Sequence, residues 1–459
     1  MRVYFTNLGC KLNQAEMEAL ARSFAAAGHT VCRRLEEADL HVVNTCTVTH
    51  VAARDSRKIA RRGRRLNPTL RTVLTGCYVA AEPEAAERLP GVDLIVGNHD
   101  KERLLEHVER RFPELRRRAT DHHASRGGAP LRDTVPGRGA AFASDAAPEE
   151  RSSLPVPYVP LPFGNSRAAV KVEDGCNMRC AFCIIPFTRG RQRSRAPETV
   201  IEEVRGLVAS GLEEIVITGV QISAYRSGAT RLYELVRRLL AETPVPRLRL
   251  TSIAPWDFDQ RLLDLVASGR LCRHFHLSLQ SGCAATLRRM RRPYTPGVLA
   301  ALLASLRRAV PGVAITTDVI VGFPGESDAE FEESLRFVGA CRFAKVHAFP
   351  YSERPGTAAA EMADPVPQTA RRERMARMLA VADEGQRAFW AARIGERAQV
   401  LWEREQEGRW LGTTDHYVRV RAVSGGAVEP GLGWARLTAV DGDAVEGEPL
   451  PRVAQRATA

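Results

Sequence analysis

The sequence Glu173-Asp-Gly-Cys176-Asn-Met-Arg-Cys180-Ala-Phe-Cys183-Ile-Ile-Pro186 places three cysteines within eight residues, directly after an apolar run at 168–172. The run indicates a buried strand, and the cysteines then lie on the loop that follows it. Three thiolates with this C-x3-C-x2-C spacing ligate three irons of a 4Fe–4S cluster and leave the fourth iron open to an exchangeable ligand. We therefore expect Cys176, Cys180 and Cys183 to hold a cluster that takes part in chemistry.

Two plainer interpretations of this loop are a zinc site and buried free thiols, because cysteine is also an ordinary small core residue. A structural zinc site needs four ligands, and no histidine stands near the loop to supply the fourth. Spacing, preceding strand and composition of the loop together favour the cluster.

Composition bounds the class of protein. The chain has 459 residues, of which 44% are hydrophobic and 26% charged, as in a soluble globular protein of about three domains. Its ten cysteines, with no signal peptide recognisable at Met1, predict reduced thiols or metal ligation in the cytoplasm rather than a disulfide framework. No apolar run approaches the roughly 20 residues that cross a membrane, so no membrane partner is expected. The net charge of +12 favours a polyanionic partner.

Residues 1–112 alternate short apolar runs with helical patterns and predict a small α/β domain. Its candidate strands, at 3–5, 41–43 and 71–74, are each followed by a cysteine: Cys10, Cys46 and Cys77. Because the carboxyl ends of parallel strands meet at one edge of a sheet, these distant thiols are expected to converge on a second open-iron cluster. Scattered core cysteines, or a zinc site completed by His50, remain alternatives. For Cys32, Cys272, Cys283 and Cys341 we expect simple packing roles.

A basic stripe follows Cys46. Six cationic residues fall at offsets that share one helical face: Arg54, Arg57, Lys58, Arg61, Arg62 and Arg65. Such a stripe is often only a solvated surface, but its like charges repel unless a polyanion neutralises them. We predict that it binds the phosphates of a nucleic acid.

The middle of the chain predicts a linker and a barrel. Residues 113–165 lack a sustained apolar period and indicate a flexible or extended connection. From 166 to 390, strands at 168–172, 214–218, 247–251, 274–279, 314–321 and 344–348 alternate with helices at 197–209, 231–241, 258–267, 296–309 and 329–338. Six such units predict an open parallel βα barrel, with its site on loops at the carboxyl ends of the strands. Polar residues there are candidate ligand contacts: Gln221, Ser252, Gln280 and Asp318.

Residues 391–450 consist of short strands and turns and predict a small antiparallel β-barrel, followed by a tail at 451–459. Barrels of this kind often bind single-stranded nucleic acid by stacking aromatic side chains on its bases. Trp402, Trp410 and Tyr417 are the candidates, although aromatic strand residues also serve as core.

The cysteine loop resembles the signature of radical S-adenosylmethionine (SAM) enzymes, in which the open iron binds SAM. Over nearly its full length the chain resembles the methylthiotransferase family, in Leu8-Gly-Cys-Lys-Leu-Asn-Gln14, Asn44-Thr-Cys46, Thr75-Gly-Cys77, Cys183-Ile-Ile-Pro186 and Arg189-Gly-Arg191. The resemblance implies two 4Fe–4S clusters and SAM as cofactors, Phe182 against the adenine of SAM, and a carboxyl-terminal TRAM domain. The chain departs from the commoner pattern at Met178-Arg179.

Thr47-Val-Thr49 and Cys77-Tyr78 are most similar to the branch that methylthiolates carbon 2 of N6-threonylcarbamoyladenosine beside the tRNA anticodon. This resemblance implies the tRNA anticodon loop and an electron-donor protein as partners, and it leaves the oligomeric state undefined. The alternatives are isopentenyladenosine in tRNA, an aspartate of a ribosomal protein, or a non-enzymatic iron–sulfur sensor that binds RNA.

Overall fold

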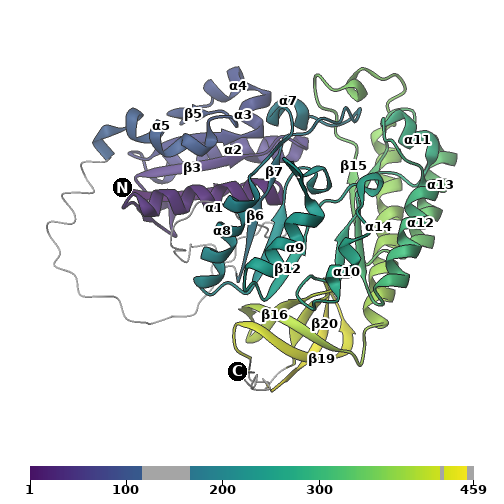
Figure 1. Ribbon diagram of the computed structural model, residues 1–459. Helices are drawn as coiled ribbons and strands as arrows, with labels where there is room; N and C mark the ends of the chain where they lie inside the picture. Colours follow the sequence, from purple (N-terminus) through teal and green to yellow (C-terminus); the bar gives the residue numbers. More distant parts are fainter. Residues whose placement is uncertain (116–165, 424–427, 452–459) are drawn as a thin grey trace. The chain divides into compact units, whose positions relative to one another are not determined.

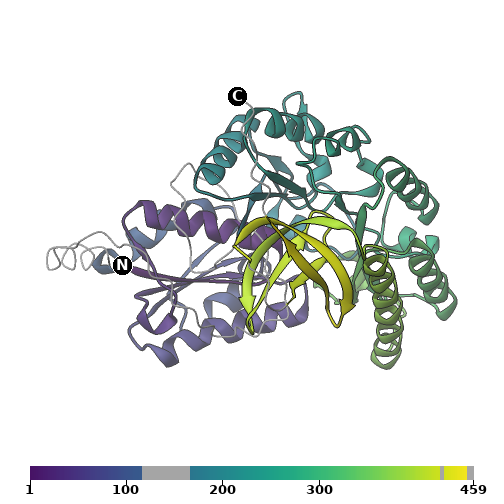
Figure 2. The same cartoon turned by 90° about the horizontal axis from the view of Figure 1, so that it is seen from below.

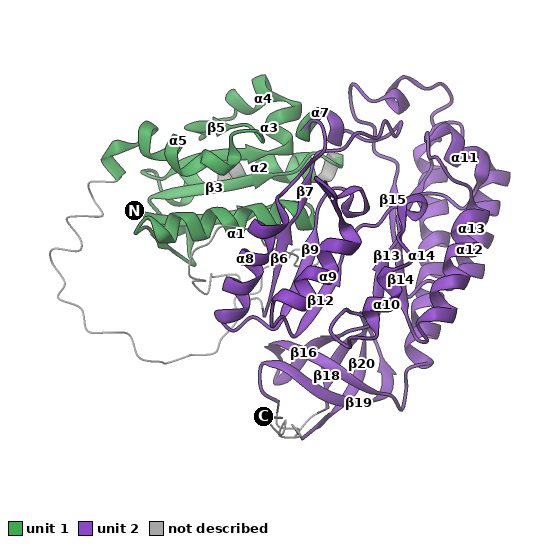
Figure 3. Cartoon of the chain, in the orientation of Figure 1, with its two compact units in different colours: residues 1–163, 187–189 green, residues 164–186, 190–459 purple. Residues whose placement is uncertain are grey.

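The computed structural model describes residues 1–115, 166–423 and 428–451. Most of the predicted linker at 113–165 and of the tail at 451–459 lies outside the described residues. The chain forms two compact units, each described by itself: unit 1 is residues 1–163 with 187–189, and unit 2 is residues 164–186 with 190–459 (Figure 3). The three-residue segment 187–189 therefore belongs to unit 1 although its neighbours in sequence belong to unit 2.

Unit 1 is built on a parallel sheet of five strands, in the order β2-β1-β3-β4-β5 (Figure 1). The strands are β1 (Arg2–Asn7), β2 (Thr30–Val31), β3 (Leu40–Thr45), β4 (Arg71–Gly76) and β5 (Leu94–Val96). The helices between them are α1 (Lys11–Ala26), α2 (His50–Leu66), α3 (Cys77–Ala81) and α4 (Pro83–Glu87), and α5 (Leu104–Arg111) follows the last strand. This arrangement confirms the predicted α/β class for the amino-terminal part.

Side chains alternate between the two faces of this sheet, as the two-residue period of a strand requires. On β3 and β4, Val42 and Val73 pack with α1 and α5, whereas Val43 and Leu74 pack with α2 and α3. Helices thus cover both faces of the sheet, and β3 is buried throughout. The strand order reverses direction between β1 and β3, and ligands of open α/β sheets bind at such a switch point, beyond the carboxyl ends of the strands.

Unit 2 contains six parallel strands in two sheets of three, ordered β12-β9-β6 and β13-β14-β15. They are β6 (Arg167–Lys171), β9 (Glu214–Thr218), β12 (Arg247–Leu250), β13 (His274–His276), β14 (Ala314–Val321) and β15 (Lys345–Pro350). Single parallel bridges, Leu248 with Leu271 and Ile253 with Leu277, join the two sheets. Among the described strands β6 and β15 do not pair, so the predicted open six-stranded barrel is confirmed.

Helices follow these strands in alternation: α8 (Pro197–Ala209), α9 (Leu232–Glu242), α10 (Leu262–Val266), α11 (Ala284–Arg289), α12 (Pro296–Ala309) and α13 (Asp328–Cys341). The bounds of α8 and α12 match the sequence prediction. The predicted helix at 258–267 is shorter, because a 3-10 turn at Pro255–Asp257 occupies the approach to it. A long helix, α14 (Gln368–Ala391), packs against β15 and leads to the last domain.

The carboxyl-terminal strands close into a barrel in the order β16-β17-β18-β20-β19 (Figure 2). They are β16 (Arg397–Gln406), β17 (Arg409–Thr414), β18 (Arg419–Ala422), β19 (Gly431–Asp441) and β20 (Ala444–Leu450). The predicted small antiparallel β-barrel is confirmed with one exception, because β18 and β20 run parallel. An odd number of strands cannot alternate in direction around a closed ring, so five strands need at least one parallel pair. The predicted domain boundaries within each unit stay predictions.

Candidate active site

The loop Cys176–Cys183 leaves the carboxyl end of β6 through a short hairpin of β7 (Glu173–Asp174) with β8 (Arg193–Ser194). Gly175 stands at the turn into the loop with φ of +73°, and a Cβ there would lie 2.2 Å from the carbonyl oxygen of Arg191. Within the loop the amide of Met178 donates to the Cys176 Sγ at 3.4 Å, and that of Cys183 donates to the Cys180 carbonyl oxygen at 3.1 Å. The backbone therefore folds the three thiols toward one another.

We expect Gly175→Ala to lower the iron content of this loop severalfold. The positive φ costs about 1–2 kcal/mol for any L side chain, and the collision with Arg191 must in addition push the hairpin off the loop. Gly228→Ala is the matched control, because Gly228 also has a positive φ but its Cβ would meet open space. Iron and sulfide analysis after anaerobic reconstitution measures the difference, and equal loading of the two variants contradicts the assignment.

The thiols of this loop are close enough to affect one another's ionisation. Burial, and then the neighbouring Cys180 and Cys176 thiols, raise the pKa of Cys183 to about 12. Burial also raises the pKa of Cys176. Both thiols thus hold their protons at neutral pH until a metal displaces them, which is how a thiol site couples metal binding to proton release.

Arg292 lies against this loop, and sequence reasoning missed it. Its guanidinium donates to the Cys180 Sγ at 3.4 Å and to the Ser278 carbonyl oxygen at 3.0 Å, and its Cζ lies 4.5 Å from the centre of the Trp256 ring. The Nε atom is buried and has no hydrogen-bond partner among the described residues. No local sequence signal marks this residue, because Cys180 is 112 positions away along the chain. A cation fixed beside a thiol, with a donor to spare, is suited to an anionic ligand such as a carboxylate.

Of the predicted SAM contacts, Gln221, Ser252 and Gln280 lie beyond strand ends, whereas Asp318 lies within β14 rather than at its end. The Gln221 Oε1 lies 4.0 Å from the Cys176 Sγ. The backbone amide of Gln221 donates to the Glu173 Oε2 at 2.9 Å. Gln280 has φ of +69° and pairs with β14, its amide donating to the Asp318 carbonyl oxygen at 2.8 Å. Ser252, just beyond β12, is half-buried. Phe182, within the cysteine loop, is half-buried too. The structure brings Gln221 to the cysteines and Gln280 to Asp318.

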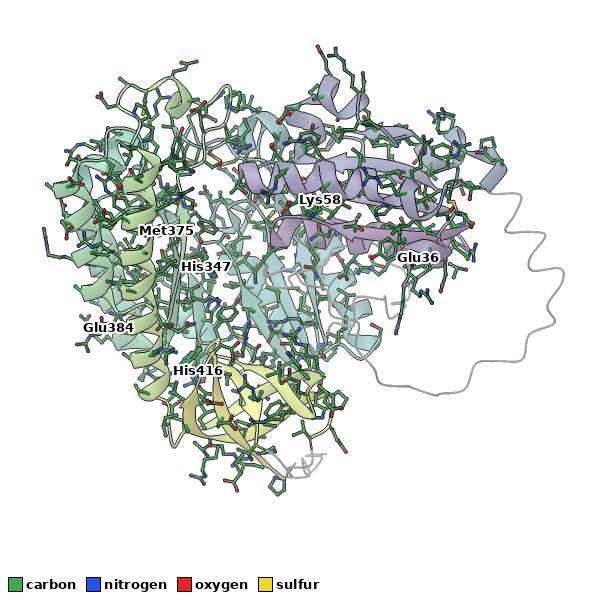
Figure 4. The ribbon with its side chains drawn as sticks, turned by 180° about the vertical axis from the view of Figure 1, so that it is seen from behind. Glu36, Lys58, His347, Met375, Glu384 and His416 are labelled. Atoms are coloured by element: carbon green, nitrogen blue, oxygen red, sulfur yellow. The ribbon has the colours of Figure 1, made fainter. Side chains whose placement is uncertain are left out.

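Asp318 is held as a carboxylate. Burial acts to raise its pKa, but the His276 ring 3.0 Å away, with His347 and Arg292, outweighs burial and lowers it. His347, labelled in Figure 4, lies on β15 with its ring centre 5.9 Å from that of His276. Arg292 donates to the Cys180 Sγ, and its positive charge also helps to lower the Asp318 pKa. It therefore links the cysteine loop to the second half of the barrel.

The second set of thiols is in unit 1. Cys10 precedes α1, Cys46 follows β3 and Cys77 begins α3 after β4, so all three stand at the carboxyl edge of the sheet, two of them at its switch point. Gly9, with φ of +94°, lets the Cys10 loop approach closely: a Cβ on it would lie 2.5 Å from the Cys46 Cβ. The convergence of these loops matches the donor set of a cluster.

Burial, followed by the Cys10 and Cys77 thiols, raises the pKa of Cys46 to about 12. Cys10 keeps exposed surface, yet the protein crowded around its thiol raises its pKa also, while Arg189 works in the opposite direction. Among the described residues no group of histidine, cysteine, aspartate or glutamate side chains is spaced to hold a single metal ion. The His50 side chain, the alternative zinc ligand, lies outside the described residues.

All ten cysteines are free thiols. Cys32, Cys272, Cys283 and Cys341 are buried, in agreement with the packing roles expected for them.

Comparison with known proteins shows which family this chain belongs to. A family model described as the Radical SAM superfamily matches residues 170–338, and one described as uncharacterized protein family UPF0004 matches residues 2–97. A relative named threonylcarbamoyladenosine tRNA methylthiotransferase MtaB, from Bacillus subtilis, is 36% identical over 91% of this chain and 89% of its own. The chain belongs to the radical SAM methylthiotransferase family.

Other members of this methylthiotransferase family carry two names. The MtaB protein of Aquifex aeolicus is 33% identical over 92% of this chain and 96% of its own. A tRNA-2-methylthio-N(6)-dimethylallyladenosine synthase of Cereibacter sphaeroides is 32% identical over 98% of both chains. A solved radical SAM methyltransferase, TsrM from Kitasatospora setae, matches with a TM-score of 0.53 at 20% identity, covering 78% of this chain and 76% of its own. That likeness confirms the fold.

The basic stripe of this methylthiotransferase is on α2. Arg54, Lys58 and Arg65 are exposed, and Lys58 is labelled in Figure 4. The Arg57 guanidinium instead lies over the Tyr78 ring at 5.7 Å, and Arg54 contacts Asp55 at 3.4 Å. Arg61 and Arg62 belong to the helix, but their side chains lie outside the described residues. Three described cations of the stripe therefore face outward.

The aromatic candidates of the carboxyl-terminal barrel are engaged within the protein. Trp402 is buried in the barrel core, which Trp410 also contacts, and Tyr417 stacks on His274 with ring centres 4.4 Å apart. Trp402 is thus not an available stacking surface. Trp434, which was not among the candidates, is exposed, and the Arg397 guanidinium lies 4.6 Å from its ring centre.

Among the described residues no helix is long and apolar enough to cross a membrane.

Proposed function

We propose that this enzyme adds a methylthio group to carbon 2 of N6-threonylcarbamoyladenosine beside the tRNA anticodon. The observation that carries the proposal is the pair of three-thiol sites, one at the strand ends of each unit, in a chain whose relatives named MtaB are 31–36% identical over most of its length. One thiol trio suits a SAM-cleaving centre, and the second suits a reaction that needs a further sulfur-bearing centre.

Cys176, Cys180 and Cys183 would hold one 4Fe–4S cluster, and Cys10, Cys46 and Cys77 the other. When bound, these clusters and SAM supply the electron, the radical, the sulfur and the methyl group of the reaction. The residues present fit them: each trio lies at the carboxyl ends of strands, and Gly175, Gly9 and Gly76, beside the ligand loops of Cys176, Cys10 and Cys77, have positive φ and leave no room for a side chain. The raised thiol pKa values mean that loading releases protons.

The remaining site residues would bind and orient SAM. Arg292 presents a fixed guanidinium beside Cys180, which suits the carboxylate of SAM, and Gln221 stands beside Cys176. Asp318 stays ionised through His276 and can accept hydrogen bonds from ribose hydroxyls or from the amino group. Phe182, Ser252 and Gln280 complete the proposed set, with Phe182 against the adenine.

Mass spectrometry of tRNA nucleosides from a deletion strain tests the substrate. We expect the methylthio form of N6-threonylcarbamoyladenosine to disappear and its unmodified precursor to accumulate, with restoration by the intact gene. Loss of methylthiolated isopentenyladenosine alone would instead support the activity named for relatives such as the Cereibacter sphaeroides synthase. Normal tRNA with an unmodified ribosomal-protein aspartate would identify the third substrate.

The non-enzymatic alternative, an RNA-binding iron–sulfur sensor, makes a different prediction. Such a protein would not cleave SAM, so reductive cleavage by the anaerobically reconstituted chain excludes it. We further propose an electron-donor protein as the source of the electron, and the cytoplasm as the location, since free thiols persist in a reducing compartment.

The outward-facing cations of α2 give a test of RNA binding. We expect Lys58→Glu with Arg65→Glu to weaken tRNA binding and to reduce the slope of log affinity against log salt by about 1–2, since each lost phosphate contact removes about 0.7 on a single strand. Lys58 and Arg65 are preferable to Arg57, whose reversal would also disturb Tyr78 beside Cys77. Arg88→Glu with Arg103→Glu, both exposed elsewhere in unit 1, is the control. Equal salt slopes for the two double variants would contradict phosphate binding by α2 and show that its basic stripe is an ordinary solvated surface.

A further inference from the structure

Arg189 is buried in unit 1 within a network of charged and amide side chains. Its guanidinium donates to the Glu16 Oε1 at 2.8 Å and Oε2 at 3.1 Å, and to the Asn13 Oδ1. Lys101 donates to the Glu16 Oε2 at 2.6 Å. Arg189 is 1% exposed, Lys101 2% and Glu16 5%.

This network reaches all three loops that carry Cys10, Cys46 and Cys77. Asn13 donates to the Leu8 carbonyl oxygen at 2.9 Å and to that of Thr45 at 3.0 Å, two positions before Cys10 and one before Cys46. Asn98 donates to the Thr188 carbonyl oxygen at 2.8 Å, and its Nδ2 lies 3.8 Å from the Cys77 Sγ. The segment 187–189 is thus fastened among the thiol loops of unit 1.

The charges of this network act on the thiols. Arg189 donates to Asn13, which itself bonds the residue before Cys46, and Thr188, next to Arg189, accepts from Asn98 beside the Cys77 Sγ. These bonds keep the positive charge of Arg189 close to the thiols. Three thiolates on a 4Fe–4S core leave a net negative charge, and reduction by one electron adds another. A fixed positive charge nearby stabilises the reduced form more than the oxidised form, and a fixed negative charge does the reverse.

We propose that Arg189 and Glu16 set the reduction potential of the cluster held by Cys10, Cys46 and Cys77, Arg189 raising it and Glu16 lowering it. This inference rests on the proposed function, which puts a cluster on those thiols. It makes Arg189 a positioning residue that acts through the cluster, beyond its part in fastening the segment 187–189 to α1.

The test uses the full chain with Cys176, Cys180 and Cys183 all changed to alanine, so that only the second site binds iron. The midpoint potential of the reconstituted cluster is followed by electron paramagnetic resonance during a redox titration. We expect Arg189→Gln to make the potential more negative, Glu16→Gln to make it more positive, and Arg189→Lys to leave it near the parent value. Opposite shifts from two neighbouring variants are the signature of charge, because a general loosening of the site would move both in the same direction.

Asp93→Asn is the matched control. Asp93 is another largely buried carboxylate of unit 1, contacted by Arg64 at 2.6 Å and Arg71 at 3.1 Å at the amino end of β4, away from Cys77. Its removal should leave the potential unchanged. If the parent chain binds no iron, the proposed second cluster fails. If iron is bound but Arg189→Gln and Glu16→Gln leave the potential unchanged or shift it in one direction, the charge role fails. If Arg189→Gln binds no iron, the Glu16→Gln variant decides the question by itself: a more positive potential supports the charge role, and an unchanged or more negative potential contradicts it.

Discussion

Cys180→Ala is expected to abolish reductive cleavage of SAM, whereas Cys46→Ala leaves cleavage intact and stops formation of the methylthio product. Cys180 accepts from Arg292, and Cys176 in the same loop lies beside Gln221. All of these residues belong to unit 2. Cys46 belongs to the other trio, in unit 1, where its backbone amide donates to the Ser56 hydroxyl at 3.1 Å. Because the trios occupy separate units, loss of one ligand should not disturb the other site.

The expected size of both effects is more than a hundredfold, since even partners in the outer shell of a metal site cost about 10–100-fold when removed. The measurements are 5′-deoxyadenosine formed per chain under dithionite reduction, and methylthiolated nucleoside formed on tRNA. Cys341→Ala is the control, because Cys341 is buried in α13 apart from both trios. Normal product from Cys46→Ala would sink the claim of a second cluster, and SAM cleavage by Cys180→Ala would displace the first.

Glu214→Gln is expected to loosen the attachment of the carboxyl-terminal barrel and to lower the melting temperature of unit 2 by about 10 °C. The Glu214 carboxylate is fully buried at the start of β9 and accepts from Arg247, from Arg249 at 2.9 Å and from Arg167 at 3.4 Å. Removing one partner of a buried ionic group costs about 3–5 kcal/mol, because the others stay buried without compensation.

The same arginines hold the barrel. Arg247 donates to the carbonyl oxygens of Thr413 at 2.9 Å and Gln399 at 3.3 Å, and Arg249 to those of Thr414 at 3.0 Å and Asp415 at 3.1 Å. These residues belong to β16, β17 and the loop after β17, where His416 is labelled in Figure 4. Glu214 therefore orients the side chains that join the two parts of unit 2.

Acid should reproduce the effect of Glu214→Gln. Burial acts to raise the Glu214 pKa, but Arg247, Arg249 and Arg167 outweigh it and hold the pKa well below 4.5. A depressed folded-state pKa means that the stabilisation is present above pH 4.5 and is lost as the pH falls toward the folded value. Differential scanning calorimetry measures both effects. Glu198→Gln, which removes an exposed partner of Arg238, is the control and should change the melting temperature little. Equal melting of the two variants would show that Glu214 does not fasten the barrel.

Much of the fold was predictable because its local signals agree. The strand-like runs and the helical period between them located α8, α12, β9 and β14 to the residue. Each signal is local, since it depends on side chains within one turn or strand, and tertiary packing did not override it. Strand β12 shows the limit: its sequence Arg247-Leu-Arg-Leu250 alternates like a strand with one exposed face, yet both arginines are buried by Glu214 and the barrel.

The sequence by itself predicted Cys176, Cys180 and Cys183 as one set, because their spacing along the chain and the strand before them suffice to define it. For Cys10, Cys46 and Cys77 spacing left alternatives open, and the family resemblance favoured a second set. The sequence did not determine which distant groups meet the thiols. Arg292 is 112 residues from Cys180, and Arg189 is 173 residues from Glu16, so neither contact follows a local period. The order of the strands in each sheet also depends on which distant elements pair, and no local period predicts it. Only the tertiary structure could place a cation beside each set of thiols, because such contacts depend on how the folded elements pack.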